Sequence, residues 1–433
     1  MRTILLILML GIFSFNSAQT YKPIDTADYL ERKNFLTNYT KDTEVFNKKQ
    51  KEKYEGKTGR ELTNSLSRFQ KYFQEEVKSK NFVFNTIFNK YVNTVVDQIL
   101  KSNSLNFPNL KILVEKDNTP NAYCMGDGTL VVNMGLFYWV DNQDQFASVI
   151  CHELGHLFLD HTIKTQLADM KFEKNGKEEF KSLVSEQNNK GEKAYQIYKR
   201  QLYKFSAEKR KQENEADSLG YVYYLKSNFA KSEFKNALLT LKQFDSISPK
   251  VLKTETYKQF FDLPEHPFKE KWLQKEDFST YDYSHYKEKI DKDSVASHPE
   301  LDLRIKYLDT QFPDQNVTVK KVESSAEFQV LEKTARLEFL PNFYQSEDFG
   351  VGIYSALQLL QNETQETDYY KYWLGKNFEK IFEGRKNYKL NRYLDRVDPK
   401  NQDESYQQFL NFMWNLSLDD IKYIAEFYNK KSL

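Results

Sequence analysis

The stretch SVICHELGHLFLDH, residues 148–161, holds three of the six histidines in this chain of 433 residues. Within it, His152, Glu153 and His156 form the pattern H-E-x-x-H. Residues four apart on a helix face the same side, so the two imidazoles converge on one ion while Glu153 reaches a water beside that ion. The alternative is an ordinary buried helix with hydrogen-bonded histidines, which is costly to satisfy without an ion. The pattern therefore predicts a metal site.

A second stretch, ENEADSLGYVYY, offers the third protein ligand that a peptidase zinc site requires. Glu213 and Asp217 lie one helical turn apart on a stripe that is otherwise apolar, whereas such a charged helix alone is typical of a solvated face. We expect Glu213 to complete the ligand set and Asp217 to orient an imidazole N–H. The prediction is one Zn²⁺ per chain, held by His152, His156 and Glu213, with Glu153 as the general base.

The patterns around these motifs predict a mainly α fold with a small β-sheet (α+β). LKILVEKD and a segment around residues 130–133 have the character of strands, and a glycine turn precedes the second of them. Amphipathic helices are expected over residues 82–100 and through the H-E-x-x-H stretch, and a helical hairpin over residues 162–211. The C-terminal hairpins suggest stacking like tetratricopeptide units, without a clear repeat.

The chain begins with Arg2, an apolar run and the small residues Ser17 and Ala18, the pattern of a cleaved secretory signal. We therefore divide it into a signal peptide and three further parts, and expect an exported protein, either periplasmic or secreted. The four predicted parts are a signal peptide (1–18), an N-terminal helical segment (19–80), a zinc peptidase domain (81–312) and a helical C-terminal region (313–433).

The composition excludes several classes of partner. The 63 basic and 62 acidic residues are spread along the chain, which gives no support to nucleic-acid binding. No later apolar run reaches eighteen residues, so we expect no transmembrane segment in the mature chain. Cys124 and Cys151 are too few for a disulfide framework, and buried thiols are favoured over a single disulfide.

The combination of HELGHLFLDH with ENEAD and a later glycine resembles peptidase family M48, whose zinc peptidases have a gluzincin-type domain. NAYCMGDGTLVVNMGLF, DNQDQFASVI and SHPELDLRI fit the same family, and the resemblance covers residues 82–308. It implies the ligand set already predicted and a soluble, exported member. It also adds His298 as a catalytic residue that stabilises the oxyanion or blocks the open zinc position. The alternative for His298 is a helix-start residue before Pro299.

These features together predict a zinc-dependent metalloendopeptidase that hydrolyses polypeptide substrates, such as unfolded or misassembled envelope proteins. The alternative is a chaperone-like or scaffold protein with a latent site, whose C-terminal helices bind a protein partner.

The strand around residues 130–133 is expected to be an edge to which an extended substrate adds. The predicted substrate-binding residues are Leu130, Val131, Val132 and Asn133. Of the other histidines, we expect His161 to hydrogen-bond locally and His266 and His285 to lie at the surface.

Overall fold

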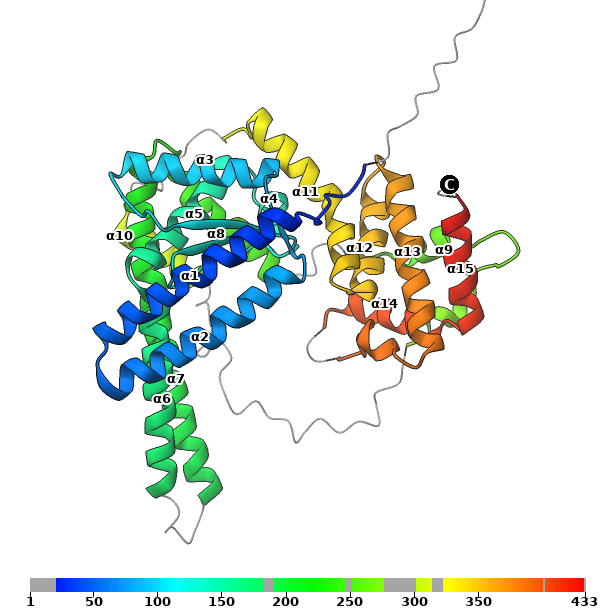
Figure 1. Cartoon of the computed structure of the whole chain (residues 1–433). Coiled ribbons are helices and arrows are strands. Elements are labelled where there is room, and N and C mark those ends of the chain that lie inside the picture. The colour runs from blue at the N-terminus through cyan, green and yellow to red at the C-terminus, as the bar shows by residue number, and fades with distance from the viewer. Residues whose placement is uncertain are drawn as a thin grey trace, which may run out of the picture.

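The computed structural model describes residues 21–182, 190–246, 251–275, 301–313, 322–399 and 402–431. The predicted signal peptide, His285 and His298 lie outside these residues. The described chain forms two lobes, a mixed lobe that contains the H-E-x-x-H helix and an all-helical lobe near the C-terminus (Figure 1). The predicted α+β class is confirmed.

Two long helices, α1 (Tyr29–Lys53) and α2 (Gly56–Lys78), pack against each other at the edge of the first lobe (Figure 1). The buried face of α2 repeats at helical spacing and includes Leu62, Leu66 and Phe73. Helices are therefore present where the N-terminal helical segment was predicted.

The small sheet has four strands in the order β1-β2-β4-β3. Strands β2 and β4 are parallel, and the other two pairings are antiparallel. Helix α3 (Ile87–Ser102) follows β1 and starts later than predicted, because Thr86 and Asn89 form a capping box and the residues before them pair as a strand. The strand bounds are β1 (Phe82–Val83), β2 (Lys111–Glu115), β3 (Ala122–Cys124) and β4 (Thr129–Asn133).

The predicted substrate edge at Leu130, Val131, Val132 and Asn133 is wrong. These residues form β4, which is hydrogen-bonded to β2 on one side and to β3 on the other, so no further strand can pair with it. The edge strand beside β4 is β3, which forms a tight hairpin with it. Gly128 closes the turn with a φ of +86°, a conformation that favours glycine.

The H-E-x-x-H stretch lies on α5 (Gln143–Phe158), and α7 (Lys190–Lys226) packs along it. Two glycines permit the close approach. A Cβ at Gly155 would lie 2.7 Å from the Ala216 carbonyl oxygen, and a Cβ at Gly220 would lie 3.0 Å from the Cys151 carbonyl. These two glycines therefore allow α5 and α7 to pack closely.

The predicted helical hairpin is formed by α6 (His161–Ser182) and the first part of α7, which project together from the lobe (Figure 1). Because α7 continues without a break into ENEAD, the hairpin and the second motif share one helix. The remaining helices of this lobe are α4 (Met134–Trp139), α8 (Lys231–Ser246) and α10 (Leu301–Gln311).

The second lobe has its own hydrophobic core. The segment of residues 251–275 contributes Tyr257, Phe261 and Trp272 to this core, and all three are fully buried. The packing therefore places these residues in the core of the second lobe. The helices of the lobe are α9 (Thr254–Phe261), η2 (Glu270–Leu273), α11 (Ala326–Gln345), α12 (Phe349–Asn362), α13 (Thr367–Lys386), η5 (Leu390–Arg392), α14 (Glu404–Asn415) and α15 (Leu418–Lys431).

Helix α11 joins the two lobes. Phe328 and Leu331 on its first half belong to the core of the first lobe, whereas Leu337 and Leu340 belong to the core of the second. Within the described part of the chain, none of the helices has the length and apolar character that crossing a membrane requires.

Candidate metal centre

Helix α5 presents the predicted ligands because its start is fixed. Asn142 is its N-cap, and the side-chain oxygen accepts hydrogen bonds from the backbone N–H groups of Asp144 and Gln145, each at 3.0 Å. The face that includes Ile150 and Leu154 packs into the core. His152 and His156 lie one turn apart on the side that meets α7.

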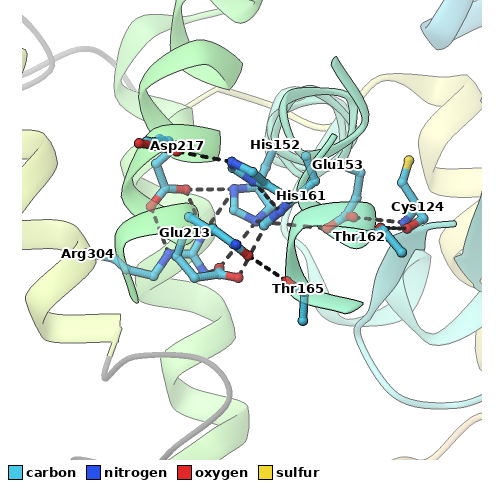
Figure 2. A network of polar contacts seen from close by, with 12 residues as sticks. Cys124, His152, Glu153, His161, Thr162, Thr165, Glu213, Asp217 and Arg304 are labelled. Carbon is cyan, nitrogen blue, oxygen red and sulfur yellow. Dashed lines mark hydrogen bonds and ion pairs between the residues drawn. The ribbon is translucent and has the colours of Figure 1, made fainter. Parts of the chain in front are cut away.

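The structure brings the three predicted ligands together. Two of them, His152 and Glu213, are labelled in Figure 2. The Nε2 atoms of His152 and His156 lie 3.0 Å apart. The two carboxylate oxygens of Glu213 on α7 each lie 3.5 Å from one of these nitrogens. The three ligand atoms lie within 4.8 Å of one another, a cluster found among the described residues.

This arrangement fits a tetrahedral zinc site. Four ligand atoms about 2.0–2.1 Å from a zinc ion lie about 3.3 Å from one another. The 3.0 Å between the two Nε2 atoms is close to that edge length, and each carboxylate oxygen of Glu213 lies 3.5 Å from one of them, Oε2 from His152 and Oε1 from His156. The donor set of two imidazoles and one carboxylate is the one that catalytic zinc sites use when the fourth position is kept for water.

Asp217 lies behind His152, as predicted, with Oδ1 2.8 Å from Nδ1 of the ring. The same carboxylate accepts two hydrogen bonds from Arg304 on α10, at 2.8 Å and 2.6 Å. Arg304 also lies 3.3 Å from the carboxylate of Glu213. A carboxylate behind a ligand histidine fixes the tautomer of the ring and leaves its other nitrogen to face the ion.

The charges around the ligands shift their pKa values in opposite directions. Burial and the Arg304 charge lower the pKa of His152, but Asp217 and Glu213 outweigh them and raise it to about 9. Burial and the neighbouring His152 lower the pKa of His156 to about 3. Burial opposes ionisation of Asp217, but Arg304 and His152 outweigh it and lower the pKa of Asp217 to about 2. The buried charges of Asp217 and Arg304 thus offset each other next to His152.

Glu153 lies between the ligands and the sheet edge. Its Oε1 is 3.9 Å from Nε2 of His152, and its Oε2 accepts a hydrogen bond of 3.1 Å from the backbone N–H of Cys124 on β3 (Figure 2). The carboxylate is therefore adjacent to the ion-binding atoms without being one of the three clustered ligands, as a general base requires.

Two residues beside the ligands were not predicted to act there. His161 hydrogen-bonds locally as expected, but its partner is a ligand, since its Nδ1 lies 3.0 Å from Nδ1 of His156. Its Nε2 lies 3.2 Å from the Glu215 carboxylate. Arg304 was part of the family resemblance without an assigned role. Its signal was a basic residue among the apolar positions of the helix that includes Leu301 and Leu308.

The remaining predicted residues have simpler outcomes. His298 lies outside the described residues, so its role stays a prediction. Cys124 and Cys151 are both free thiols, Cys151 buried as favoured and Cys124 partly exposed, and burial raises the pKa of each. His266 is partly buried rather than at the surface, and its ring stacks with those of Trp272 and Tyr423.

The chain is similar to known peptidases. The model of peptidase family M48 matches residues 87–311, about half of the chain. A beta-barrel assembly-enhancing protease from Yersinia pestis is 29% identical over 91 residues, which are 21% of this chain and 18% of that protein. The similarity thus spans less than a fifth of that relative. With its ligand cluster inside the matched range, the chain belongs to peptidase family M48, a family of metallopeptidases.

Proposed function

We propose that the protein is a zinc-dependent metalloendopeptidase that hydrolyses peptide bonds in extended polypeptides. The observation that carries the proposal is the cluster of His152, His156 and Glu213, whose ligand atoms lie within 4.8 Å of one another beside a carboxylate base. The spacing on α5 and the carboxylate on α7 fit one zinc ion per chain.

The residues of the site divide the chemistry among them. His152, His156 and Glu213 hold the ion, which when bound polarises a carbonyl and acidifies water. Glu153 accepts a proton from the attacking water and then donates it to the leaving amine. Asp217 and Arg304 keep His152 oriented through their bonds to each other and to the ring.

The sheet edge offers a place for an extended substrate. In the hairpin, the Asn133 N–H bonds to the Asn121 carbonyl, and the Met125 N–H bonds to the Thr129 carbonyl. The backbone groups of Asn121 and Met125 therefore point toward β4. Because this direction alternates along an antiparallel strand, Ala122 directs its N–H and C=O away from β4. A peptide that pairs with Ala122 would pass beside Glu153, because Glu153 already accepts a bond from the next outward N–H, that of Cys124.

We further propose that the enzyme is exported and acts on unfolded or misassembled envelope proteins. The pattern of the first twenty residues supports export, and the printed name of the Yersinia pestis relative describes a protease that enhances beta-barrel assembly. An edge strand that binds a substrate through main-chain hydrogen bonds suits substrates whose backbone is exposed.

Zinc analysis of the purified full-length chain tests the metal. We expect one zinc per chain, hydrolysis of casein, loss of both with a chelator and recovery when zinc is added back. His156→Ala removes a ligand and is expected to abolish stoichiometric zinc and cleavage. His266→Ala is the matched control, because His266 contacts Asp420 in the second lobe instead. A chain that binds no zinc, or a His156→Ala variant that keeps it, contradicts the proposal. A metal-free chain that binds unfolded proteins without cleaving them would favour the chaperone-like alternative.

A further inference from the structure

The segment before α1, residues 21–28, has no regular secondary structure and runs from the second lobe to the first (Figure 1). At its start, Tyr21 packs against the core of the second lobe, and its ring meets that of Tyr369 edge to face with the centroids 6.0 Å apart. Three residues later, Ile24 packs against the core of the first lobe. We call residues 21–28 the strap, because they contact both lobes.

The strap completes the hydrogen bonding of a buried ion pair. Glu338 on α11 is fully buried, and its Oε2 atom lies 2.9 Å from Nζ of Lys116, whose side chain is 3% exposed. The other oxygen, Oε1, accepts a hydrogen bond of 2.5 Å from the Tyr21 hydroxyl and one of 2.7 Å from the backbone N–H of Ile24. Nζ of Lys116 also donates to the Ile24 carbonyl at 3.4 Å. A buried carboxylate without its donors is costly, so the strap stabilises this pair.

The end of the strap near α1 is fixed separately to the first lobe. Arg32 on α1 is 6% exposed, and its guanidinium donates to the carbonyls of Thr26 and Ala27 at 2.8 and 2.9 Å. A change at Tyr21 therefore releases one end of the strap and leaves the other end anchored.

The ion pair holds the loop that leads into the proposed substrate edge. The loop, residues 116–121, connects β2 to β3, and its last three residues line a cavity that Glu153 also lines. The strap and Glu338 contact the loop at Lys116, and α11 contacts it two residues later, at Asn118. The position of the loop determines where β3 starts, and β3 is the strand to which we propose that the substrate adds.

We infer that the strap positions the substrate-binding edge: through Glu338 and Lys116 it holds residues 116–121, and thereby the start of β3, in the conformation that receives an extended peptide. The inference rests on the proposed peptidase function. Tyr21, Lys116 and Glu338 act through the loop, so they are positioning residues and not catalytic ones. Weakening the strap impairs substrate binding and leaves the proton transfer by Glu153 intact.

Tyr21→Ala in the full-length chain tests whether the strap holds the loop. The variant loses the hydroxyl donor and the ring, while Arg32 keeps the other end of the strap in place. The backbone N–H groups of Lys116 and Asn121 are hydrogen-bonded, so their exchange with solvent deuterium reports opening of the loop. We expect amide exchange in residues 116–121 to become about tenfold faster, because a hydrogen bond to a charged group is lost. Exchange in α14 and α15 should not change.

Lys22→Ala is the matched control, because Lys22 is the next residue of the strap and its side chain is exposed. Its exchange in residues 116–121 should equal that of the parent. Tyr21→Phe keeps a ring beside Tyr369 but not the hydroxyl, so we expect an intermediate increase of about threefold. Parental exchange of the loop in Tyr21→Ala, or an equal increase in Lys22→Ala, overturns the inference. An increase that extends to α14 and α15 indicates general destabilisation and overturns it as well.

Cleavage kinetics of the zinc-loaded protein on casein provide the second readout. Tyr21→Ala should raise KM by about 3–10-fold and keep kcat within about twofold of the parent, since a displaced edge weakens binding without changing the reacting groups. Zinc content should stay at the parental level. An unchanged KM, with or without a fall in kcat, overturns the positioning role. Failure of the parent protein to cleave casein contradicts the proposed function, whereas the exchange data still decide whether the strap holds the loop.

Discussion

At the scale of single residues, Arg304 links the ligands to their support. It is 6% exposed, donates two hydrogen bonds to Asp217 and lies close to Glu213 and His152. Its charge offsets two carboxylates that would otherwise repel each other in a buried site. The residue therefore has more influence on the ligand geometry than its absence from the H-E-x-x-H pattern suggests.

We predict that Arg304→Gln weakens zinc binding by about 10–100-fold, because Asp217 and Glu213 lose the group that orients them. Arg304→Lys keeps the charge but not the paired N–H donors, and should restore only part of the affinity. Competition with a chelator on metal-stripped protein measures both. Lys306→Gln on the exposed side of the same helix is the control. Parental zinc affinity in Arg304→Gln would show that the contact is incidental.

The ligands were predictable, whereas the contact between Arg304 and Asp217 was not, for a physical reason. His152, Glu153 and His156 are close in sequence, so helical geometry alone brings them together. Glu213 was found because a carboxylate on an apolar stripe needs a buried partner. Arg304 contacts Asp217 across 87 residues of sequence, and no local pattern encodes such a contact.

At the scale of elements, the wrong prediction of β4 as an edge strand shows that a sequence pattern can identify a strand without giving its position in the sheet. All five residues of β4 are buried, and a continuous apolar run predicts a buried strand. The order of strands depends on the short β3, whose three residues carry little pattern of their own. The element was therefore predictable, but its neighbours were not.

A second element with a specific polar anchor is the start of α15. The Asp420 carboxylate accepts bonds from the backbone N–H and hydroxyl of Ser417 at 2.8 and 2.7 Å, and from Lys269 at 2.6 Å. Burial opposes ionisation, but Lys269 and Ser417 outweigh it and hold the pKa of Asp420 well below its usual range. This stabilisation is present above the unfolded-state pKa of about 3.9 and is lost as the pH falls toward the folded-state value.

Asp420→Asn should lower the free energy of unfolding of the second lobe by about 1–2 kcal/mol at pH 7, because it removes a charged capping group. Thermal melts should show a loss of about 2–6 °C that shrinks below about pH 4. Asp419→Asn, at an exposed neighbouring position, is the control. A loss that is equally large at pH 3 and pH 7 would mean that the carboxylate charge is not responsible.

At the scale of the whole molecule, α11 ties the second lobe to the rim of the site. Asn118 donates to the Phe339 carbonyl at 2.8 Å and accepts from the Asn342 side chain at 2.9 Å. The buried pair of Lys116 and Glu338 adds a further link at 2.9 Å. Thr119, Pro120 and Asn121, which follow Asn118, line a cavity beside His152 and Glu153, so α11 is packed next to the wall of that cavity.

This arrangement could not be predicted from the sequence. The helices of the second lobe were recognisable from their apolar spacing, but α11 divides its own buried face between two cores. The apolar periodicity of a helix indicates that one of its faces is buried, but it does not identify which other element packs against that face. The boundary at residue 312 therefore remains a prediction.

The central claim is that Glu153 moves the proton while its neighbours hold the ion, and the cleavage rate of Glu153→Gln in the zinc-loaded full-length chain tests it most directly. Glutamine preserves the shape of the side chain and an acceptor for the Cys124 N–H, but it cannot accept the proton of water. We predict that the variant retains one zinc per chain and cleaves casein about 10²–10⁴-fold more slowly than the parent. Cleavage at the parental rate by the zinc-loaded variant would contradict the account.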